Sequence, residues 1–267
     1  MTDLHLESFG EGFPALFVHG SFGWGREAFR KQLELADEHR VVLLDRRGFG
    51  HSPAAATLGW DTDRYDLAAL LDELGPAHLV GQSYGGVVSL LAAALRPGLV
   101  RSLVAIEPPA FEVARGRPAV DAVLAAFEVV YDEAPALSGA HFVESWARAS
   151  GWSAQQVEEW TASFGRSEWE AVESSRRERW PGDAPFDFET LADASFPKVL
   201  ARGAWPQLGV PGRQEVGSAY AAVCEVIAGR IGGHVVVFER SGHNPQLQEA
   251  EAFNALLRSV WAEAERV

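Results

Sequence analysis

Short runs of apolar residues alternate with longer segments of helical periodicity along most of the chain. Polar or turn-forming residues bound each run, a pattern typical of strands buried on both faces. The runs lie at residues 15–18, 41–44, 78–80, 99–106, 198–201 and 234–238. Strands that alternate with helices predict an α/β fold, in which a mostly parallel sheet is covered by helices on both faces.

The segments between these strands predict helices at residues 26–38, 62–74, 84–95, 216–228 and 247–264. Within residues 62–74, leucines recur at the i, i+3, i+4 and i+7 spacing of one buried helix face: Leu67, Leu70, Leu71 and Leu74. Gly75-Pro76 and Pro97-Gly98 follow two of these helices, where residues that end a helix are expected.

The alternation stops between residues 108 and 193, where the pattern is helical and rich in aromatic residues. We therefore expect residues 1–107 and 194–267 to form the core, with residues 108–193 inserted as a helical cap. An aromatic pocket under such a cap would suit a hydrophobic ligand, and Trp180 and Trp205 are the preferred pocket residues. The alternative is that these large side chains build the core of the cap itself.

Composition narrows the functional classes. Lys and Arg total 23 against 37 Asp and Glu, a formal net charge of −14. This balance argues against nucleic-acid binding, which needs clustered cations, and disfavours anionic substrates at long range. No apolar run is long enough to predict a membrane span. Asp3 and Glu7 do not fit a secretory signal, and the single Cys224 cannot form an intramolecular disulfide, so we expect a cytoplasmic protein.

The strongest chemical signal is the segment Gly81-Gln82-Ser83-Tyr84-Gly85-Gly86. It is a G-x-S-x-G pattern placed directly after an apolar strand and directly before a helix, which is typical of a nucleophile elbow. The glycines two positions before and two positions after the serine permit the sharp turn that exposes its hydroxyl. The alternative interpretation is a chance glycine-rich turn, and the position between a strand and a helix argues against it.

At this point the chain resembles the α/β-hydrolase family over nearly its whole length. Four landmarks occur in the family's order: His19-Gly20 after a strand, the run Asp45 to Ser52 after the next, the elbow at Ser83, and the run Ser241 to Pro245 after the last strand. The resemblance implies a serine hydrolase that requires no cofactor. No dinucleotide, phosphate-loop or paired metal-ligand motif is present, so no metal is expected either.

The resemblance assigns the general base to His243, since a serine hydroxyl needs a base within hydrogen-bond distance. His51 is a weaker candidate for the base, and His19 is expected to shape the loop that binds the oxyanion. Backbone amides of Tyr84, and of Ser21 or Phe22, are the expected oxyanion donors.

The acid of the triad departs from the commonest family pattern. Most members carry an Asp shortly after the strand that follows the cap, but residues 198–207 contain no carboxylate. Glu107 ends the strand after the elbow helix, a position that is similar to the acid of haloalkane dehalogenases and zearalenone-type lactonases. We expect the order Ser83, Glu107, His243; the alternatives are that Glu107 only caps the first turn of the cap, or that Glu215 is the acid.

The expected activity is hydrolysis of a carboxylic ester or lactone of a hydrophobic small molecule through an acyl-enzyme on Ser83. Ser83 cannot replace the aspartate with which dehalogenases form an alkyl ester, so acyl chemistry is favoured. The open alternatives are a lyase, a carbon–carbon bond hydrolase, a perhydrolase, and a non-catalytic small-molecule receptor of the same fold. The sequence does not determine the oligomeric state.

Overall fold

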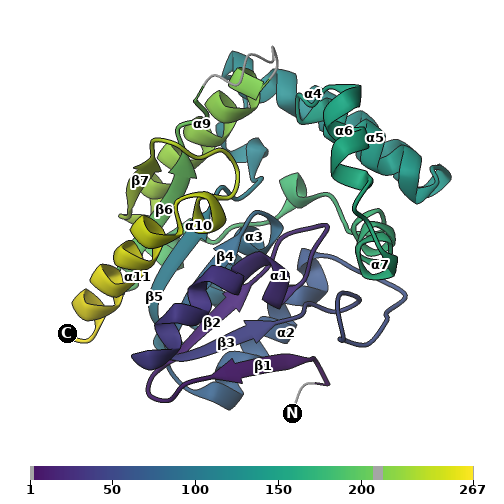
Figure 1. The fold of residues 1–267 in the computed structure, drawn as a ribbon. Helices are drawn as coiled ribbons and strands as arrows, with labels where there is room; N and C mark the ends of the chain where they lie inside the picture. Colours follow the sequence, from purple (N-terminus) through teal and green to yellow (C-terminus); the bar gives the residue numbers. More distant parts are fainter. Residues whose placement is uncertain (1–2, 207–212, 267) are drawn as a thin grey trace.

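The computed structural model describes residues 3–206 and 213–266, and its centre is one twisted sheet (Figure 1). Within these residues the sheet has seven strands in the order β1-β3-β2-β4-β5-β6-β7. Only β1 (Leu6–Phe9) is antiparallel, and it pairs with β3 (Arg40–Leu44) at one edge. The sequence did not predict β1. The mostly parallel sheet itself is confirmed.

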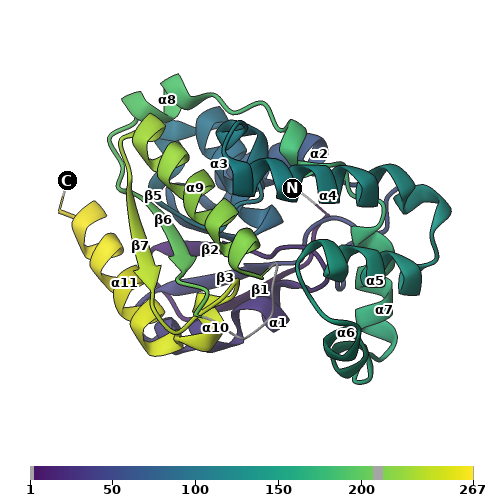
Figure 2. The same ribbon diagram turned by 90° about the horizontal axis from the view of Figure 1, so that it is seen from above.

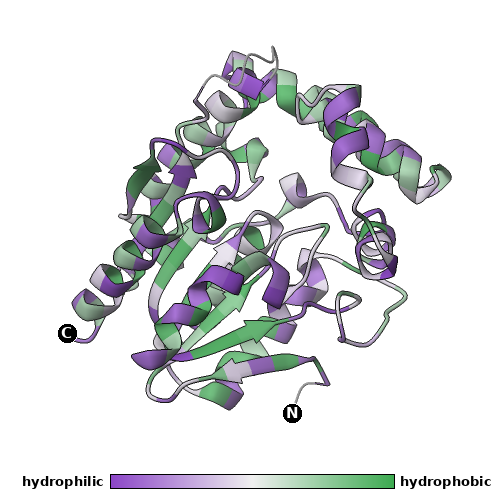
Figure 3. Cartoon of the chain, viewed as in Figure 1, coloured by the Kyte–Doolittle hydropathy of each residue, from purple (hydrophilic) through white to green (hydrophobic). Residues whose placement is uncertain are grey.

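The remaining strands lie close to the predicted runs. They are β2 (Pro14–Val18), β4 (Ala77–Gln82), β5 (Val100–Ile106), β6 (Lys198–Gly203) and β7 (His234–Phe238). β2 and β4 are buried along their whole length, which explains why they read as continuous apolar runs. Figure 3 shows this hydrophobic centre of the sheet.

Helices cover both faces of the sheet, as the alternating pattern predicts (Figure 2). One layer contains α2 (Trp60–Leu74), α3 (Tyr84–Leu95) and α9 (Arg213–Ile231), and the other contains α1 (Gly25–Phe29), α10 (Pro245–Gln248) and α11 (Ala250–Ala264). Side chains of β2 alternate between the layers: Leu16 and Val18 join the first core, and Ala15 and Phe17 join the second.

Two predicted helices are interrupted in the structure. The segment predicted as a helix at 26–38 becomes a short α1 followed by a 3₁₀ segment, η1 (Arg30–Asp37). The segment predicted at 247–264 breaks at Glu249, between α10 and α11. The Glu249 carboxylate accepts hydrogen bonds from the Arg240 amide and the Ser241 hydroxyl, contacts that tie this break to the loop after β7.

Between β5 and β6 the chain forms a run of helical segments: η3 (Phe111–Ala114), α4 (Pro118–Glu133), η4 (Ala134–Ala136), α5 (Gly139–Ala149), α6 (Ala154–Thr161), α7 (Arg166–Ser175), η5 (Pro181–Asp183) and α8 (Phe188–Asp193). α4 to α7 lie beyond the carboxyl ends of the central strands (Figure 1), while α8 packs against α3 and α9. The limits of a separate cap domain stay a prediction. No helix among the described residues is both long and apolar enough to span a bilayer.

A buried ion cluster joins this helical run to the sheet. Arg46, which follows β3, is 1% exposed and lies 2.7 Å from both Asp63 of α2 and Glu178 after α7. The same guanidinium donates to the carbonyl oxygens of His19 and Gly20, 2.9 and 3.0 Å away. Three distant segments and the loop after β2 are therefore fixed by one cation.

The cluster contains two carboxylic acids, Asp63 and Glu178, and one guanidinium, that of Arg46. Burial raises the pKa of Asp63 to about 7, against the lowering effect of the Arg46 charge. Burial also raises the pKa of Glu178, and Arg46 and Ser21 oppose this shift. Removing carboxylates from water disfavours their charged forms, so the folded protein holds a proton in this cluster more tightly than the unfolded chain does.

We therefore expect stability to depend on the ionisation of Asp63. Because its folded pKa of about 7 exceeds its ordinary value of 3.8, the stabilisation is fully present below pH 3.8 and is lost as the pH rises through 7. Between those limits, the unfolding free energy of the natural protein should fall relative to that of Asp63→Asn by roughly 3 to 5 kcal/mol. Urea denaturation at a series of pH values measures the difference. Asp66→Asn, on the same helix, is the matched control, and a pH-independent difference for Asp63→Asn contradicts the expectation.

Candidate active site

Ser83 occupies the sharp turn between β4 and α3. Its φ of 53° and ψ of −120° are unusual for a residue with a side chain. The turn depends on its glycines: a Cβ on Gly85 would lie 2.1 Å from the Val18 carbonyl oxygen, and one on Gly81 would lie 2.3 Å from the Gly85 carbonyl oxygen. A larger residue at either position would push α3 away from the sheet, so the sequence G-x-S-x-G and this geometry require each other.

Glu107 and His243 lie in direct contact. Glu107 follows β5, is fully buried, and places Oε2 2.7 Å from His243 Nδ1 in the loop after β7. Its other oxygen, Oε1, accepts from the Gly203 amide at 2.9 Å and from the indole N–H of Trp205 at 2.8 Å. These three hydrogen bonds compensate the loss of water around the carboxylate.

Trp205 differs from the simple pocket residue that the sequence analysis predicted. It lines the cavity, but its indole nitrogen also donates to Glu107, and its ring stacks on Tyr220 with centroids 6.0 Å apart. Tyr220 in turn lies 4.8 Å from the His243 ring. The sequence analysis did not predict a role for Tyr220 or for the Gly203 amide. Position alone could have indicated Gly203 and the contact of Trp205 with Glu107, because both residues lie where most family members carry their acid after this strand.

The predicted site residues surround one cavity of about 710 Å³. Its lining includes eight of them: His19, Ser21, Phe22, Ser83, Tyr84, Trp180, Trp205 and His243. Glu107 is absent from this lining and contacts His243, which belongs to it. Glu215, the alternative acid, is exposed on α9 and is absent from this lining.

The aromatic residues of the helical run both line the cavity and form a core between the helices, the two alternatives of the sequence analysis. Trp146 and Trp160 line the cavity and also pack with Phe142 and Val172 in a small core formed by α4, α5 and α7. Phe22, from the loop after β2, joins this core through a ring contact of 4.7 Å with Trp146. The helical run and the loop after β2 are therefore packed as one unit over the cavity.

The loop after β2 is held by specific hydrogen bonds. The Phe22 amide donates to Ser175 Oγ at 2.8 Å, and the Ser21 hydroxyl donates to Glu178. Among the residues that the structure describes, the Ser21 amide has no hydrogen-bond partner. Of the two loop amides predicted as oxyanion donors, Ser21 is therefore the available one, because that of Phe22 is used by Ser175.

His19 is fully buried and fixed in one protonation state. Its Nε2 accepts from the Arg46 amide at 2.9 Å, so its Nδ1 carries the proton and donates to the Gly20 carbonyl at 2.6 Å. Burial, followed by the nearby Arg46 charge, holds the pKa of His19 well below its usual value. His19 therefore stays neutral and shapes the loop.

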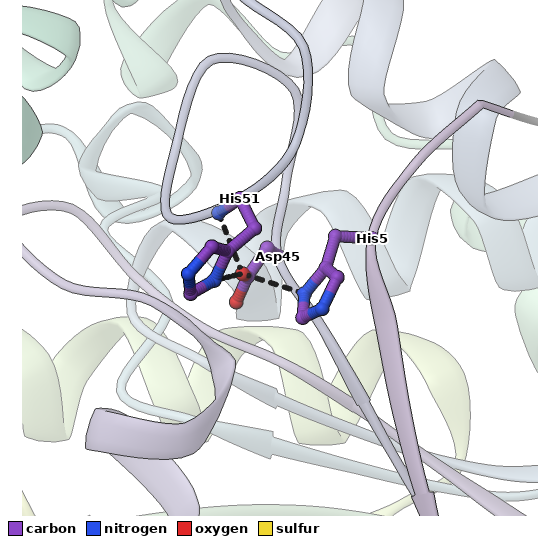
Figure 4. A group of neighbouring side chains, drawn as sticks. All are labelled: His5, Asp45 and His51. Carbon is purple, nitrogen blue, oxygen red and sulfur yellow. Dashed lines mark hydrogen bonds and ion pairs between the residues drawn. The ribbon is translucent and has the colours of Figure 1, made fainter.

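His51 lies outside this cavity. Figure 4 shows it beside Asp45 and His5, and its side chain is 77% exposed. Asp45 Oδ2 accepts from His5 Nδ1 and from the His51 amide, both at 3.0 Å, while Oδ1 accepts from the Gly25 amide at 2.9 Å. Two histidines and an aspartate are residue types that bind transition metals. Both carboxylate oxygens of Asp45, however, already accept the hydrogen bonds just described. A second such group, also of two histidines and an acid, consists of His39, His78 and Glu265.

Comparison with known proteins agrees with this architecture. Lipase LipV of Mycobacterium tuberculosis is 40% identical over 130 residues, which are 47% of this chain and about half, 49%, of that protein. (E)-2-((N-methylformamido)methylene)succinate hydrolase of Acinetobacter baylyi is 27% identical over 97% of this chain and 94% of its own. A thermophilic esterase of Thermogutta terrifontis has a similar structure, with a TM-score of 0.68, 23% identity, and coverage of 98% of this chain and 93% of that one.

The family model that describes the alpha/beta hydrolase fold matches residues 14–250. That range contains the whole sheet except β1, together with Ser83, Glu107 and His243. The chain therefore belongs to the α/β hydrolase fold family.

Proposed function

We propose that the protein is a serine hydrolase that cleaves a carboxylic ester or lactone of a hydrophobic small molecule. The proposal assigns Ser83 as nucleophile, His243 as general base and Glu107 as the acid that orients the base. One observation carries it: the 2.7 Å contact between His243 and the fully buried Glu107, at the cavity that Ser83 also lines. The lipase and hydrolase relatives described above support the same reaction class.

The contact supports the histidine tautomer that the proposed reaction needs. When Glu107 Oε2 accepts the Nδ1 proton of His243, Nε2 is left with a lone pair for the Ser83 hydroxyl. As Ser83 attacks the ester carbonyl, its proton moves to Nε2, and the resulting imidazolium is stabilised by the Glu107 charge. The imidazolium then donates that proton to the leaving alcohol, and the same groups activate water to hydrolyse the acyl-enzyme.

The oxyanion of the tetrahedral intermediate needs two donors near Ser83. The amide of Tyr84, at the start of α3, and the amide of Ser21 meet this need. Both residues line the cavity, and the hydrogen bond from Phe22 to Ser175 holds the loop that carries Ser21. In this proposal Ser175 and Arg46 position the loop after β2 through their hydrogen bonds to its backbone.

Residues 108–193 form the cap of the site in this proposal. The helices α4 to α7 lie over the carboxyl ends of the strands (Figure 1), and Trp146, Trp152, Trp160 and Trp180 contribute to the cavity lining. A cavity with this many aromatic side chains favours an apolar acyl or alcohol group, because burying that group releases water from both surfaces.

Labelling with a fluorophosphonate probe, together with hydrolysis of p-nitrophenyl esters of graded chain length and several lactones, tests the proposed function. We expect stoichiometric labelling that Ser83→Ala abolishes, because only an activated serine attacks the phosphorus. Mass spectrometry of the labelled peptide measures both. Tight binding of esters without labelling or turnover would instead indicate a receptor, and product formation without uptake of solvent oxygen would indicate a lyase.

Glu107→Gln should lower kcat by roughly 10⁴-fold while leaving the fold intact, since an amide cannot stabilise the imidazolium. Glu215→Gln is the matched control, because Glu215 is exposed on α9 and lies outside the cavity. Steady-state kinetics and circular dichroism of both variants provide the measurement. A Glu107 variant that retains activity within a few-fold, or a collapse in the Glu215 variant alone, would overturn the assignment of the acid.

Trp205→Phe should lower kcat by about tenfold, because one hydrogen bond to the Glu107 charge is lost while the ring remains. Trp180→Phe is the comparison, since Trp180 lines the cavity without a hydrogen bond from its indole to the triad. We expect that variant to change mainly KM. Equal effects of both substitutions on kcat and KM would show that Trp205 only shapes the pocket.

A further inference from the structure

Arg213 is a cation in an otherwise aromatic part of the cavity. It is the first residue of α9, lines the cavity with Ser83 and His243, and is only partly exposed. Its guanidinium lies 4.8 Å from the centre of the Trp152 ring, which also lines the cavity. Its Nε is buried without a hydrogen-bond partner among the described residues.

The other charged groups of the lining are already paired. Glu27 lies 3.4 Å from Arg30, Arg240 lies 3.2 Å from Glu249, and His243 contacts Glu107. Within residues 3–206 and 213–266, Arg213 forms no ion pair. Residues 207–212, the adjoining segment outside the described range, contain no Asp or Glu in the sequence.

An unpaired guanidinium in such a place is costly unless an anion joins it. Partial burial lowers the pKa of Arg213, because removal from water disfavours the charged form. An arginine presents a planar set of N–H donors that matches a carboxylate, and an aromatic ring beneath it leaves the edge of that plane available.

We infer that Arg213 binds an ionised carboxylate that the substrate carries in addition to its ester group, so that the enzyme acts on esters with a free acid group. The inference rests on the proposed function, which it makes more specific.

The helix gives the spacing between this site and the reacting bond. Arg213, Val216 and Tyr220 all line the cavity and recur at the i, i+3, i+7 spacing of one face of α9. Seven residues of helix span about 10 Å, and the Tyr220 ring lies 4.8 Å from that of His243. A flexible arginine at that distance favours a substrate whose free carboxylate is several carbon atoms from the ester.

Local and overall charge act differently here. The net charge of −14 repels anions at long range and is screened by salt. Arg213 acts at contact distance from a partly buried position, where a single pairing is stronger than between fully exposed charges. The site therefore provides discrimination between bound substrates rather than fast capture of anions.

The test compares matched acidic and neutral esters. One series pairs the 4-nitrophenyl monoesters of adipic, pimelic and suberic acids with the corresponding hexanoate, heptanoate and octanoate esters. A second places the free acid on the alcohol side, pairing acetyl esters of ω-hydroxy acids with alkyl acetates. In at least one series we expect kcat/KM for the acidic ester to exceed that for its neutral partner by about tenfold. Arg213→Gln should remove that preference, and Arg213→Lys should restore part of it.

Arg230→Gln is the matched control, because it removes one positive charge from the last turn of the same helix, away from the cavity lining. It should keep the acidic preference. Calorimetric titration of Ser83→Ala with monomethyl suberate and with methyl octanoate gives a readout that does not need turnover, and Arg213→Gln should abolish the stronger binding of monomethyl suberate in that background.

The outcomes separate the two proposals. Hydrolysis of neutral esters with no acidic preference in either series, or a preference that survives in Arg213→Gln, overturns the role of Arg213 and leaves the serine hydrolase intact. Absence of hydrolysis in every series, with stronger binding of monomethyl suberate that depends on Arg213, overturns the proposed function and retains a carboxylate-binding site.

Discussion

The site is organised around one buried carboxylate. Glu107 is fully buried, and each of its hydrogen bonds comes from a different part of the sheet edge: the Gly203 amide at the end of β6, the Trp205 indole just beyond it, and His243 after β7. An unpaired charge in this place would cost several kcal/mol. The sheet register brings the ends of β5, β6 and β7 together, and it therefore also supplies the hydrogen bonds that stabilise the buried Glu107 carboxylate.

A second buried charge performs the corresponding task on the other side of Ser83. Arg46 bonds to two backbone carbonyls of the loop after β2 and pairs with Asp63 and Glu178, so that α2, the helical run and this loop share one anchor. Charged groups at this depth contribute little net stability. Their geometric requirements are strict, however, and those requirements fix a loop that carries no secondary structure of its own.

The sequence was sufficient to predict the parts of this arrangement that depend on local pattern. The parallel sheet follows from continuous apolar runs, and the turn at Ser83 follows from glycines whose added Cβ atoms would meet backbone. The placement of Glu107 could be inferred because a residue directly after a parallel strand lies at the carboxyl edge of the sheet, where ligands bind in open α/β sheets.

What could not be predicted depends on contacts between distant segments. The bond from Trp205 to Glu107 joins residues 98 positions apart, and that from Phe22 to Ser175 joins residues 153 positions apart. The hydrophobic periodicity of a sequence reports local structure and does not indicate contacts between such distant residues. The 3₁₀ conformation of residues 30–37 was likewise missed, because its apolar spacing is compatible with an α-helix.

Backbone strain in the described residues is concentrated at the same edge. The residues other than glycine with a positive φ there are Phe22, Ser83, Glu107 and Trp205, at 65°, 53°, 40° and 52°. They follow β2, β4, β5 and β6, so each of the four central parallel strands is followed by one strained residue. Each such conformation costs about 1 to 3 kcal/mol and persists only where surrounding contacts determine it.

Those contacts are the ones already described. The Phe22 amide is held by Ser175, the Ser83 turn by its glycines, Glu107 by its three donors, and Trp205 by Glu107 and Tyr220. Ser83 and Glu107 directly follow β4 and β5, so in a relaxed β conformation their side chains would continue the alternation between the two faces of the sheet. The left-handed conformation at these two positions ends that alternation. The strain is thus the conformational requirement for bringing Phe22, Ser83 and Trp205 to one cavity and Glu107 to the histidine that lines it. The two apolar cores of the sheet provide the rigidity that maintains it.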